Sequence, residues 1–261
     1  MEPDILAYYN QGREQARLES IGRLEFLRTQ ELLRRHLPRP PATVLDVGGG
    51  AGIHALPLLA QGYAVTLIDP VELHVEQARA AGVADAAVGD ARHLQLADAV
   101  ADAVLLLGPL YHLTEEGDRV EALTEARRVA RRGGMLMAAC ISRFASTYDG
   151  LTLRYLDDPA FERIAEEDVG SGQHRNPGRR SGWFTTAYLH RPDDVVREVT
   201  DAGWSDVSLI AVEGPGAFGD PDFWLDGSDR QATLLRAIRR VESEPSILGA
   251  SPHLLVVASN R

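Results

Sequence analysis

The stretch Val44-Leu45-Asp46-Val47-Gly48-Gly49-Gly50-Ala51-Gly52 decides the fold of this 261-residue chain. Its first half is short and apolar, as in a buried strand, and its glycines form a turn before a second apolar run that can start a helix. Glycine has no Cβ, so the N–H groups of such a turn can approach a ligand closely. The helix that follows adds unpaired N–H donors and the positive end of its dipole. The stretch therefore predicts a nucleotide-type binding site.

The same strand–turn–helix pattern is repeated along the chain. Apolar strands are predicted at 43–47, 63–68, 86–88, 103–107, 135–141, 206–212 and 253–258. Helices are predicted at 53–60, 72–81, 114–130, 192–202 and 228–241. Alternation of this kind predicts an α/β fold, with a mainly parallel sheet that helices cover on both faces.

Two segments do not follow this alternation. Residues 4–37 carry apolar side chains at helical spacing and end at Pro38, so we expect residues 1–41 to form an N-terminal helical cap. From residue 142 to about 190 the alternation stops, and residues 170–182 are rich in glycine and arginine. We expect a solvated loop or a substrate lid there, inserted into a unit of residues 42–261, with a single structural domain overall.

Composition restricts the classes of partner. A net charge of −11 disfavours nucleic acid, and no apolar run reaches the roughly 18 residues that a membrane helix needs. The acidic start lacks the layout of a secretory signal peptide. The single cysteine, Cys140, has apolar neighbours and is expected to be buried, and no Cys/His spacing indicates a metal. We expect a cytoplasmic protein, and a homodimer is left open.

Three of the predicted strands lead into an acidic residue, namely Asp46, Asp69 and Asp90. Each one alone is typical of a turn or a helix cap, but the carboxyl ends of parallel strands meet at one crevice. Residues 50–55 fit the dinucleotide pattern G-x-G-x-x-G/A, which favours NAD(P). Asp46 favours a cofactor with positive charge instead, because it would repel a pyrophosphate.

A full D-x-G-x-G-x-G motif is present in Asp46-Val47-Gly48-Gly49-Gly50-Ala51-Gly52. With this motif the sequence resembles the small-molecule branch of the class I S-adenosylmethionine-dependent methyltransferases. The resemblance covers about residues 42–142. It implies a Rossmann-like, doubly wound sheet of seven strands whose last strand is antiparallel, and S-adenosylmethionine as the cofactor. It also implies that the insertion at 142–190 carries substrate selectivity.

The resemblance assigns roles to the residues at the strand ends. The glycine turn is implied to pack against the methionine part of the cofactor, and Asp46 to hold its amino group. Asp69 is implied to bind the ribose hydroxyls, and Asp90 and Ala91 the adenine. The expected cofactor-binding residues are Asp46, Gly48, Gly50, Gly52, Asp69, Pro70, Asp90, Ala91, Leu107, Gly108, Tyr8 and Arg17.

Methyl transfer requires alignment of the acceptor, exclusion of water and, for a hydroxyl or ammonium acceptor, a base. His112 follows the fourth strand, and the ordinary pKa of histidine suits this task. Alternatively, His112 orients the turn or binds substrate without taking a proton. Tyr111 is expected to line the same pocket, and His190 is a second catalytic candidate.

The residues after the fourth strand also bear on the acceptor. Gly108-Pro109-Leu110-Tyr111 stands where many methyltransferases that act on base amino groups carry Asn/Asp-Pro-Pro-Phe/Tyr. We therefore expect O- or N-methylation of a small molecule by in-line displacement. The alternatives are an NAD(P)-dependent oxidoreductase that uses residues 50–55, and a non-catalytic cofactor-binding partner protein.

Overall fold

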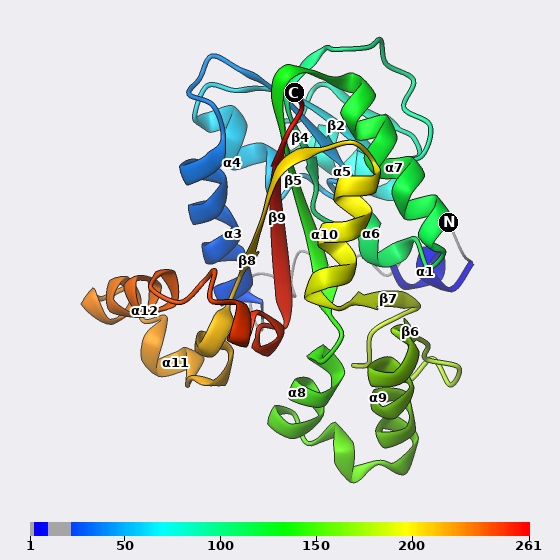
Figure 1. The fold of residues 1–261 in the computed structure, drawn as a ribbon, viewed down its shortest axis with the longest axis vertical. Coiled ribbons are helices and arrows are strands. Elements are labelled where there is room, and N and C mark those ends of the chain that lie inside the picture. The colour runs from blue at the N-terminus through cyan, green and yellow to red at the C-terminus, as the bar shows by residue number, and fades with distance from the viewer. Residues whose placement is uncertain (1–2, 10–21) are drawn as a thin grey trace.

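A twisted sheet organises the protein (Figure 1), of which the computed structural model describes residues 3–9 and 22–261. The strands are β1 (Thr43–Val47), β2 (Ala64–Asp69), β3 (Ala86–Val88), β4 (Ala101–Leu106), β5 (Ala130–Ser142), β6 (Gln173–His174), β7 (Ala187–His190), β8 (Ser205–Ala211) and β9 (His253–Ser259). The α-helices are α1 (Pro3–Tyr9), α3 (Arg23–His36), α4 (Ala55–Ala60), α5 (Glu72–Ala81), α6 (Pro109–His112), α7 (Glu116–Val129), α8 (Ala145–Thr152), α9 (Pro159–Ser171), α10 (Pro192–Asp201), α11 (Pro221–Trp224) and α12 (Asp229–Arg239). Short 3₁₀ turns span Tyr155–Asp157, Gly214–Phe218 and Pro245–Ala250.

The order of the strands is that of a doubly wound fold. β3, β2, β1, β4 and β5 lie side by side and parallel, β9 pairs antiparallel with β5, and β8 pairs antiparallel with β9. These seven strands confirm the predicted core and its antiparallel last strand. The sequence did not predict the short hairpin of β6 and β7, of which β7 pairs with the end of β5.

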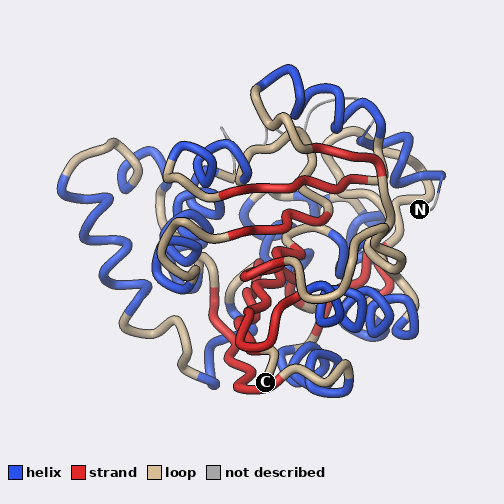
Figure 2. Tube along the Cα trace, turned by 90° about the horizontal axis from the view of Figure 1, so that it is seen from above, coloured by secondary structure: helices blue, strands red, loops and turns tan. Residues whose placement is uncertain are grey.

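Helices cover both faces of the sheet because successive residues of each strand point in opposite directions. Val44 of β1 packs in one apolar cluster with Leu32 of α3 and with side chains of α4 and α5. Its neighbour Leu45 packs in the other cluster, with side chains of α7 and α10. Figure 2 shows the strands side by side at the centre, with helices around them. Cys140 is buried in this second cluster as predicted, and burial raises the pKa of its thiol.

The insertion after β5 is more ordered than expected. α8 and α9 form much of the insertion (Figure 1). Residues 170–182 are mostly exposed, as expected, but His174 is buried against Asp168. α9 packs Phe161 and Ala165 against Trp183. The insertion thus has a small apolar core of its own, which its glycine and arginine content concealed in the sequence.

The N-terminal region contributes two described helices. α3 packs on the sheet with Leu32 and Leu33, and α1 lies near α6 at the edge where the parallel strands end (Figure 1). Residues 10–21, which include Arg17, are outside the described residues. Within 3–9 and 22–261, no helix is long and apolar enough to cross a membrane.

Candidate functional site

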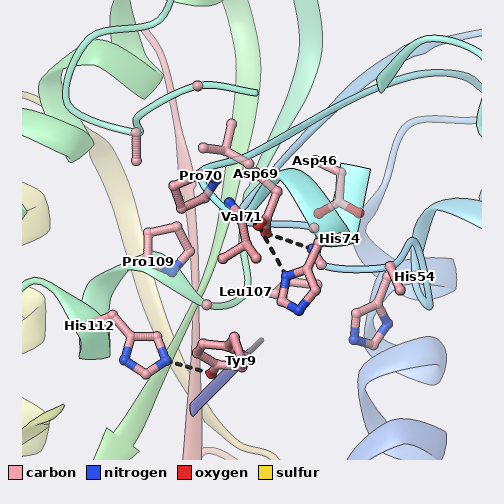
Figure 3. A pocket seen from close by; sticks show the side chains of 18 of the residues that line it. Tyr9, Asp46, His54, Asp69, Pro70, Val71, His74, Leu107, Pro109 and His112 are labelled. Atoms are coloured by element: carbon pink, nitrogen blue, oxygen red, sulfur yellow. Dashed lines mark hydrogen bonds and ion pairs between the residues drawn. The ribbon is translucent and has the colours of Figure 1, made fainter. Parts of the chain in front are cut away.

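A pocket lies at the carboxyl ends of the parallel strands (Figure 3). It is lined by the glycine turn after β1, by residues 69–71 after β2, by residues 89–92 after β3 and by residues 107–113 around α6. α1 contributes Tyr9 and α3 contributes Glu25. The pocket is therefore at the crevice where an open α/β sheet places its ligands.

The glycine turn presents its backbone to this pocket. Gly50 has a φ of 57°, in the left-handed region that favours glycine, and a Cβ added to it would meet no atom within 4 Å. Gly52 has another role, because a Cβ there would lie 3.0 Å from the Val83 side chain, and it does not line the pocket. Gly50 therefore leaves space for a ligand, whereas Gly52 allows close packing behind the turn.

Asp46 is the most unusual group of the site. Its side chain is fully buried beneath the glycine turn, and neither carboxylate oxygen has a hydrogen-bond partner among the described residues. Burial, together with the charge of Asp69, raises the pKa of Asp46 to about 7. An unpaired buried carboxylate is costly, so a ligand with positive charge would stabilise it.

Asp69, at the end of β2, is held rigidly. Its carboxylate accepts hydrogen bonds from the N–H groups of Gly50 and Val71, both at 2.9 Å, and contacts Nδ1 of His74 at 3.1 Å (Figure 3). The side chain is almost fully buried. Its remaining acceptor capacity faces the pocket wall that Pro70 and Val71 also form.

Asp90 and Ala91 form the wall after β3. Arg92 donates to both oxygens of Asp90 and also to Asp118. The hydrogen bonds from Arg92 hold the pKa of Asp90 at about 2, so this carboxylate is charged at neutral pH. Both Asp90 and Ala91 line the pocket, where the resemblance expects the adenine.

The turn after β4 lies beside the glycine turn, with Pro109 close to Gly48. Leu107 and Gly108 line the pocket, and the carbonyl of Leu107 accepts a hydrogen bond from the Tyr111 hydroxyl at 3.2 Å. His112 follows one residue later on α6. Its Nε2 lies 2.6 Å from the Tyr9 hydroxyl, and its Nδ1 lies 3.3 Å from the carbonyl oxygen of Thr186 (Figure 3).

Among the lining residues, His54 and His74 were not singled out from the sequence. His54 lies 3.0 Å from the amide nitrogen of Gln30 on α3, and burial lowers its pKa to about 4. His74 could have been found from its position in the first turn of the helix after Asp69. The partner of His54, Gln30, has no local sequence signal, because it comes from a different helix.

Some expected site residues lie elsewhere. Tyr8 is not in the pocket lining, but its ring packs against Tyr9 and Phe184 with centroids 5.2 and 5.7 Å apart. Arg17 falls outside the described residues. His190 is fully buried away from the lining, and its Nε2 lies 3.3 Å from a carboxylate oxygen of Glu198.

The surroundings of His190 explain its position. Arg119 of α7 donates two hydrogen bonds to Glu198 of α10, at 2.9 and 2.7 Å, and its guanidinium lies 3.8 Å from the centre of the Tyr188 ring. Burial lowers the pKa of His190. His190 therefore joins a buried ion-pair cluster that connects β7 to two helices, and the structure does not bring it to the pocket.

Comparison with known proteins bears on what the pocket binds. Residues 45–138 match the family model described as a methyltransferase domain. Residues 45–138 carry a methyltransferase domain. The matched residues include the glycine turn, the three strand-end aspartates and the turn after β4, and the cofactor of this family is S-adenosylmethionine. The resemblance inferred from the sequence is confirmed.

A curated relative of the methyltransferase domain is the ubiquinone/menaquinone biosynthesis C-methyltransferase UbiE of Acidiphilium cryptum (strain JF-5). It is 40% identical over 115 residues, which cover 41% of this chain and 45% of that protein. The chain therefore matches less than half the length of this curated relative.

Solved structures share the fold of the methyltransferase domain and of the rest of the chain. A protein from Thermotoga maritima, described as a possible histamine N-methyltransferase, has a TM-score of 0.62 at 18% identity, with 97% of this chain and 98% of that chain covered. The [4+2]-cyclase SpnF has a TM-score of 0.55 at 17% identity, with 89% and 80% covered. At such low identity these likenesses describe the fold, on which different chemistries occur.

Proposed function

We propose that this protein is an S-adenosylmethionine-dependent methyltransferase that acts on a small-molecule acceptor. Asp46 carries the proposal, because its buried carboxylate lies directly beneath a glycine turn at the pocket and has no hydrogen-bond partner within residues 3–9 and 22–261. S-adenosylmethionine has an ammonium and a sulfonium, and a positive charge is what such a carboxylate requires. The residues present therefore fit this cofactor.

The oxidoreductase alternative fits less well. NAD(P) would bring a pyrophosphate to the glycine turn, and Asp46 and Asp69 both lie against that turn. Two carboxylates near a pyrophosphate would repel it in a largely buried site. The acidic lining therefore supports the cationic cofactor over the dinucleotide.

We assign the cofactor contacts as follows. Asp46 would bind the ammonium of the methionine part, and Gly50 would leave room for it. Asp69 would accept hydrogen bonds from the ribose hydroxyls, because its backbone partners already fix its carboxylate. Asp90 and Ala91 would bind the adenine, since both line the wall after β3.

When bound, S-adenosylmethionine supplies a methyl group that an acceptor attacks in line as the methyl–sulfur bond breaks and its electron pair returns to sulfur. The chain itself aligns the acceptor and excludes water. His112 is the candidate base, because it lines the pocket and its Nε2 lies within hydrogen-bond distance of a hydroxyl there. Burial, the largest influence on it, lowers its pKa to about 4. Its imidazole is therefore neutral at pH 7 and can accept a proton. Tyr111 would form the adjacent wall.

The type of acceptor atom is a finer part of the proposal. A neutral histidine in the pocket suits O- or N-methylation, in which the attacking hydroxyl or ammonium gives up its own proton. The name of the Acidiphilium cryptum relative describes a C-methyltransferase, so ring carbon is also a candidate acceptor. A cytoplasmic location and a homodimer stay predictions of the sequence, as do the cap at 1–41 and the lid at 142–190.

Release of S-adenosylhomocysteine tests the proposal. The protein would be incubated with S-adenosylmethionine and a panel of small phenols, amines and carboxylic acids, and the product measured by mass spectrometry. We expect acceptor-dependent release with the wild type, and a large loss with Asp46→Asn. Equal release by both proteins, or oxidation of NADH in place of methyl transfer, would contradict the proposal.

A further inference from the structure

The hydrogen-bond partners of His112 determine which of its ring nitrogens carries hydrogen. Nδ1 faces the carbonyl oxygen of Thr186, at 3.3 Å, and a carbonyl can only accept. Nδ1 therefore carries the hydrogen of the neutral ring, and Nε2 has a lone pair. Nε2 is consequently the atom that can receive a proton or a hydrogen bond.

The group now bonded to that lone pair is the phenol of Tyr9. Its hydroxyl donates to Nε2 of His112 at 2.6 Å, a short hydrogen bond between two partly buried groups. Tyr9 is the last residue of α1 and lines the pocket, and Figure 3 shows its side chain directed at His112. An aromatic ring with a hydroxyl group thus already occupies the position beside the candidate base.

The surroundings suit an aromatic ring. The Tyr9 ring meets His112 and His74 edge to face, with centroids 5.1 and 5.4 Å apart. Tyr111 and Phe184 complete the surroundings of His112, with ring centroids 4.7 and 5.7 Å from it. Edge-to-face contacts of this kind stabilise aromatic groups beyond simple burial. We call Tyr111, His112 and Phe184 the aromatic wall.

α1 is held in place mainly by side-chain contacts. Asp4 pairs with Arg179 at the exposed surface, and its carbonyl accepts a hydrogen bond from Thr185 at 3.4 Å. Ile5 is buried, and the ring of Tyr8 rests on Phe184. A seven-residue helix is not stable by itself in water, so contacts such as these to the insertion help to hold it. Such contacts can be exchanged for a ligand of similar shape.

We propose that the methyl acceptor is a phenol, and that Tyr9 holds the place of the acceptor's hydroxyl-bearing ring until the acceptor displaces it. The inference rests on the proposed function, of which it specifies the substrate class. In the productive complex the acceptor's hydroxyl donates to Nε2 of His112, as Tyr9 does here, and its ring packs on the aromatic wall.

A phenol can accept a methyl group on oxygen, as the sequence analysis favours, or on a ring carbon, as the name of the Acidiphilium cryptum relative describes. The phenolic proton passes to Nε2 of His112, and the resulting phenolate has nucleophilic character on oxygen and on the ortho and para ring carbons. As the methyl–sulfur bond breaks and its electron pair goes to sulfur, the oxygen takes the methyl group to give an ether, or a ring carbon takes it. In the second case the ring carbon then releases its own proton to solvent, and the oxygen regains the proton held by Nε2 of His112. Asp69 supports the protonated imidazole, because its charge raises the pKa of His112 against the effect of burial.

Binding of p-cresol, whose structure reproduces the tyrosine side chain, tests this inference without any cofactor. The affinities of the wild type, Tyr9→Phe and Tyr9→Ala would be measured by calorimetry, with toluene as the probe that lacks a hydroxyl. We expect the affinity for p-cresol to increase from the wild type to Tyr9→Phe and again to Tyr9→Ala. The first substitution removes the hydrogen bond between the residue 9 ring and His112, and the second removes the ring itself. In Tyr9→Ala we expect p-cresol to bind about tenfold more tightly than toluene, since toluene leaves Nε2 of His112 unsatisfied.

Leu6→Ala is the matched control, because Leu6 is exposed on the same helix. It should bind p-cresol as the wild type does, and His112→Ala combined with Tyr9→Ala should remove the preference over toluene. Equal affinity of p-cresol and toluene for Tyr9→Ala, or equal affinity of the wild type and both Tyr9 variants for p-cresol, would overturn the inference.

A second measurement separates this inference from the proposed function. With S-adenosylmethionine present, p-cresol should give 4-methylanisole or a dimethylphenol, whereas benzylamine should give no product. Methylation of benzylamine but not of p-cresol would refute the phenol inference and leave the methyltransferase proposal intact. Failure to bind S-adenosylhomocysteine would refute the methyltransferase proposal, whatever p-cresol does.

Discussion

Asp46 gives the protein a pH-dependent affinity for its cofactor. The pKa of this carboxyl lies at about 7 in the free protein, because of burial and the charge of Asp69. To pair with the cofactor's ammonium, Asp46 has to be deprotonated. The affinity for the cofactor should therefore approach its maximum well above pH 7. Below pH 7 it should fall by up to tenfold per pH unit, as long as the pKa of Asp46 is much lower in the complex than in the free protein.

The size of the effect follows from this pKa. About three quarters of the Asp46 groups are charged at pH 7.5, and about 3% at pH 5.5, if the pKa is about 7. The dissociation constant of S-adenosylhomocysteine should thus rise about 25-fold between these pH values. Calorimetry in buffers of different ionisation enthalpy should also detect release of about one proton on binding at pH 5.5.

Asp46→Asn isolates the contribution of this group. The variant should bind about 10- to 100-fold more weakly at pH 7.5, and its affinity should change little between pH 5.5 and 7.5. Glu76→Gln, which removes an exposed carboxylate of α5, is the matched control and should behave as the wild type. An unchanged pH dependence in Asp46→Asn would refute the assignment of the titrating group.

Three further predictions concern other groups. Asp69→Ala should weaken binding of S-adenosylhomocysteine by at least tenfold in calorimetry, because the ribose hydroxyls lose a charged acceptor; unchanged affinity would remove Asp69 from the ribose site. His112→Ala should lower kcat at least 100-fold while the S-adenosylhomocysteine Kd stays within threefold, and equal loss of both would remove it from the catalytic candidates. Glu198→Gln should lower the free energy of unfolding at pH 7 by about 3–5 kcal/mol in urea titrations, because Arg119 is left buried without its carboxylate. Burial opposes ionisation of Glu198, but hydrogen bonds from His190 and Arg119 lower its pKa to about 2. The contribution of Glu198 to the free energy of unfolding is therefore present at neutral pH and should be lost as the pH falls from about 5 towards 2.

The sequence predicted the sheet because local and tertiary signals agree there. The apolar strand before Asp46 and the glycines after it determine a strand–turn–helix unit from neighbouring residues alone. α5 begins and ends where predicted, at Glu72 and Ala81, because Gly82 adopts the left-handed conformation that ends a helix. The pocket followed from the general rule that parallel strands end at one crevice.

The rest of the site depends on contacts between distant parts of the chain. Tyr9 and His112 are separated by 103 residues, and only the packing of α1 against α6 and the insertion brings them together. His190 resembled a catalytic residue because it follows the insertion, but Glu198 and Arg119 surround it in the core. A histidine's sequence position does not indicate whether it meets a pocket or a buried carboxylate.

Calorimetric titration with S-adenosylhomocysteine, with NAD as the control ligand, tests the central claim most directly. If Asp46 and the glycine turn form a site for a cationic cofactor, S-adenosylhomocysteine should bind in the micromolar range at pH 7.5 and NAD should not bind. Binding of NAD alone would contradict the account and would make residues 50–55 a dinucleotide loop.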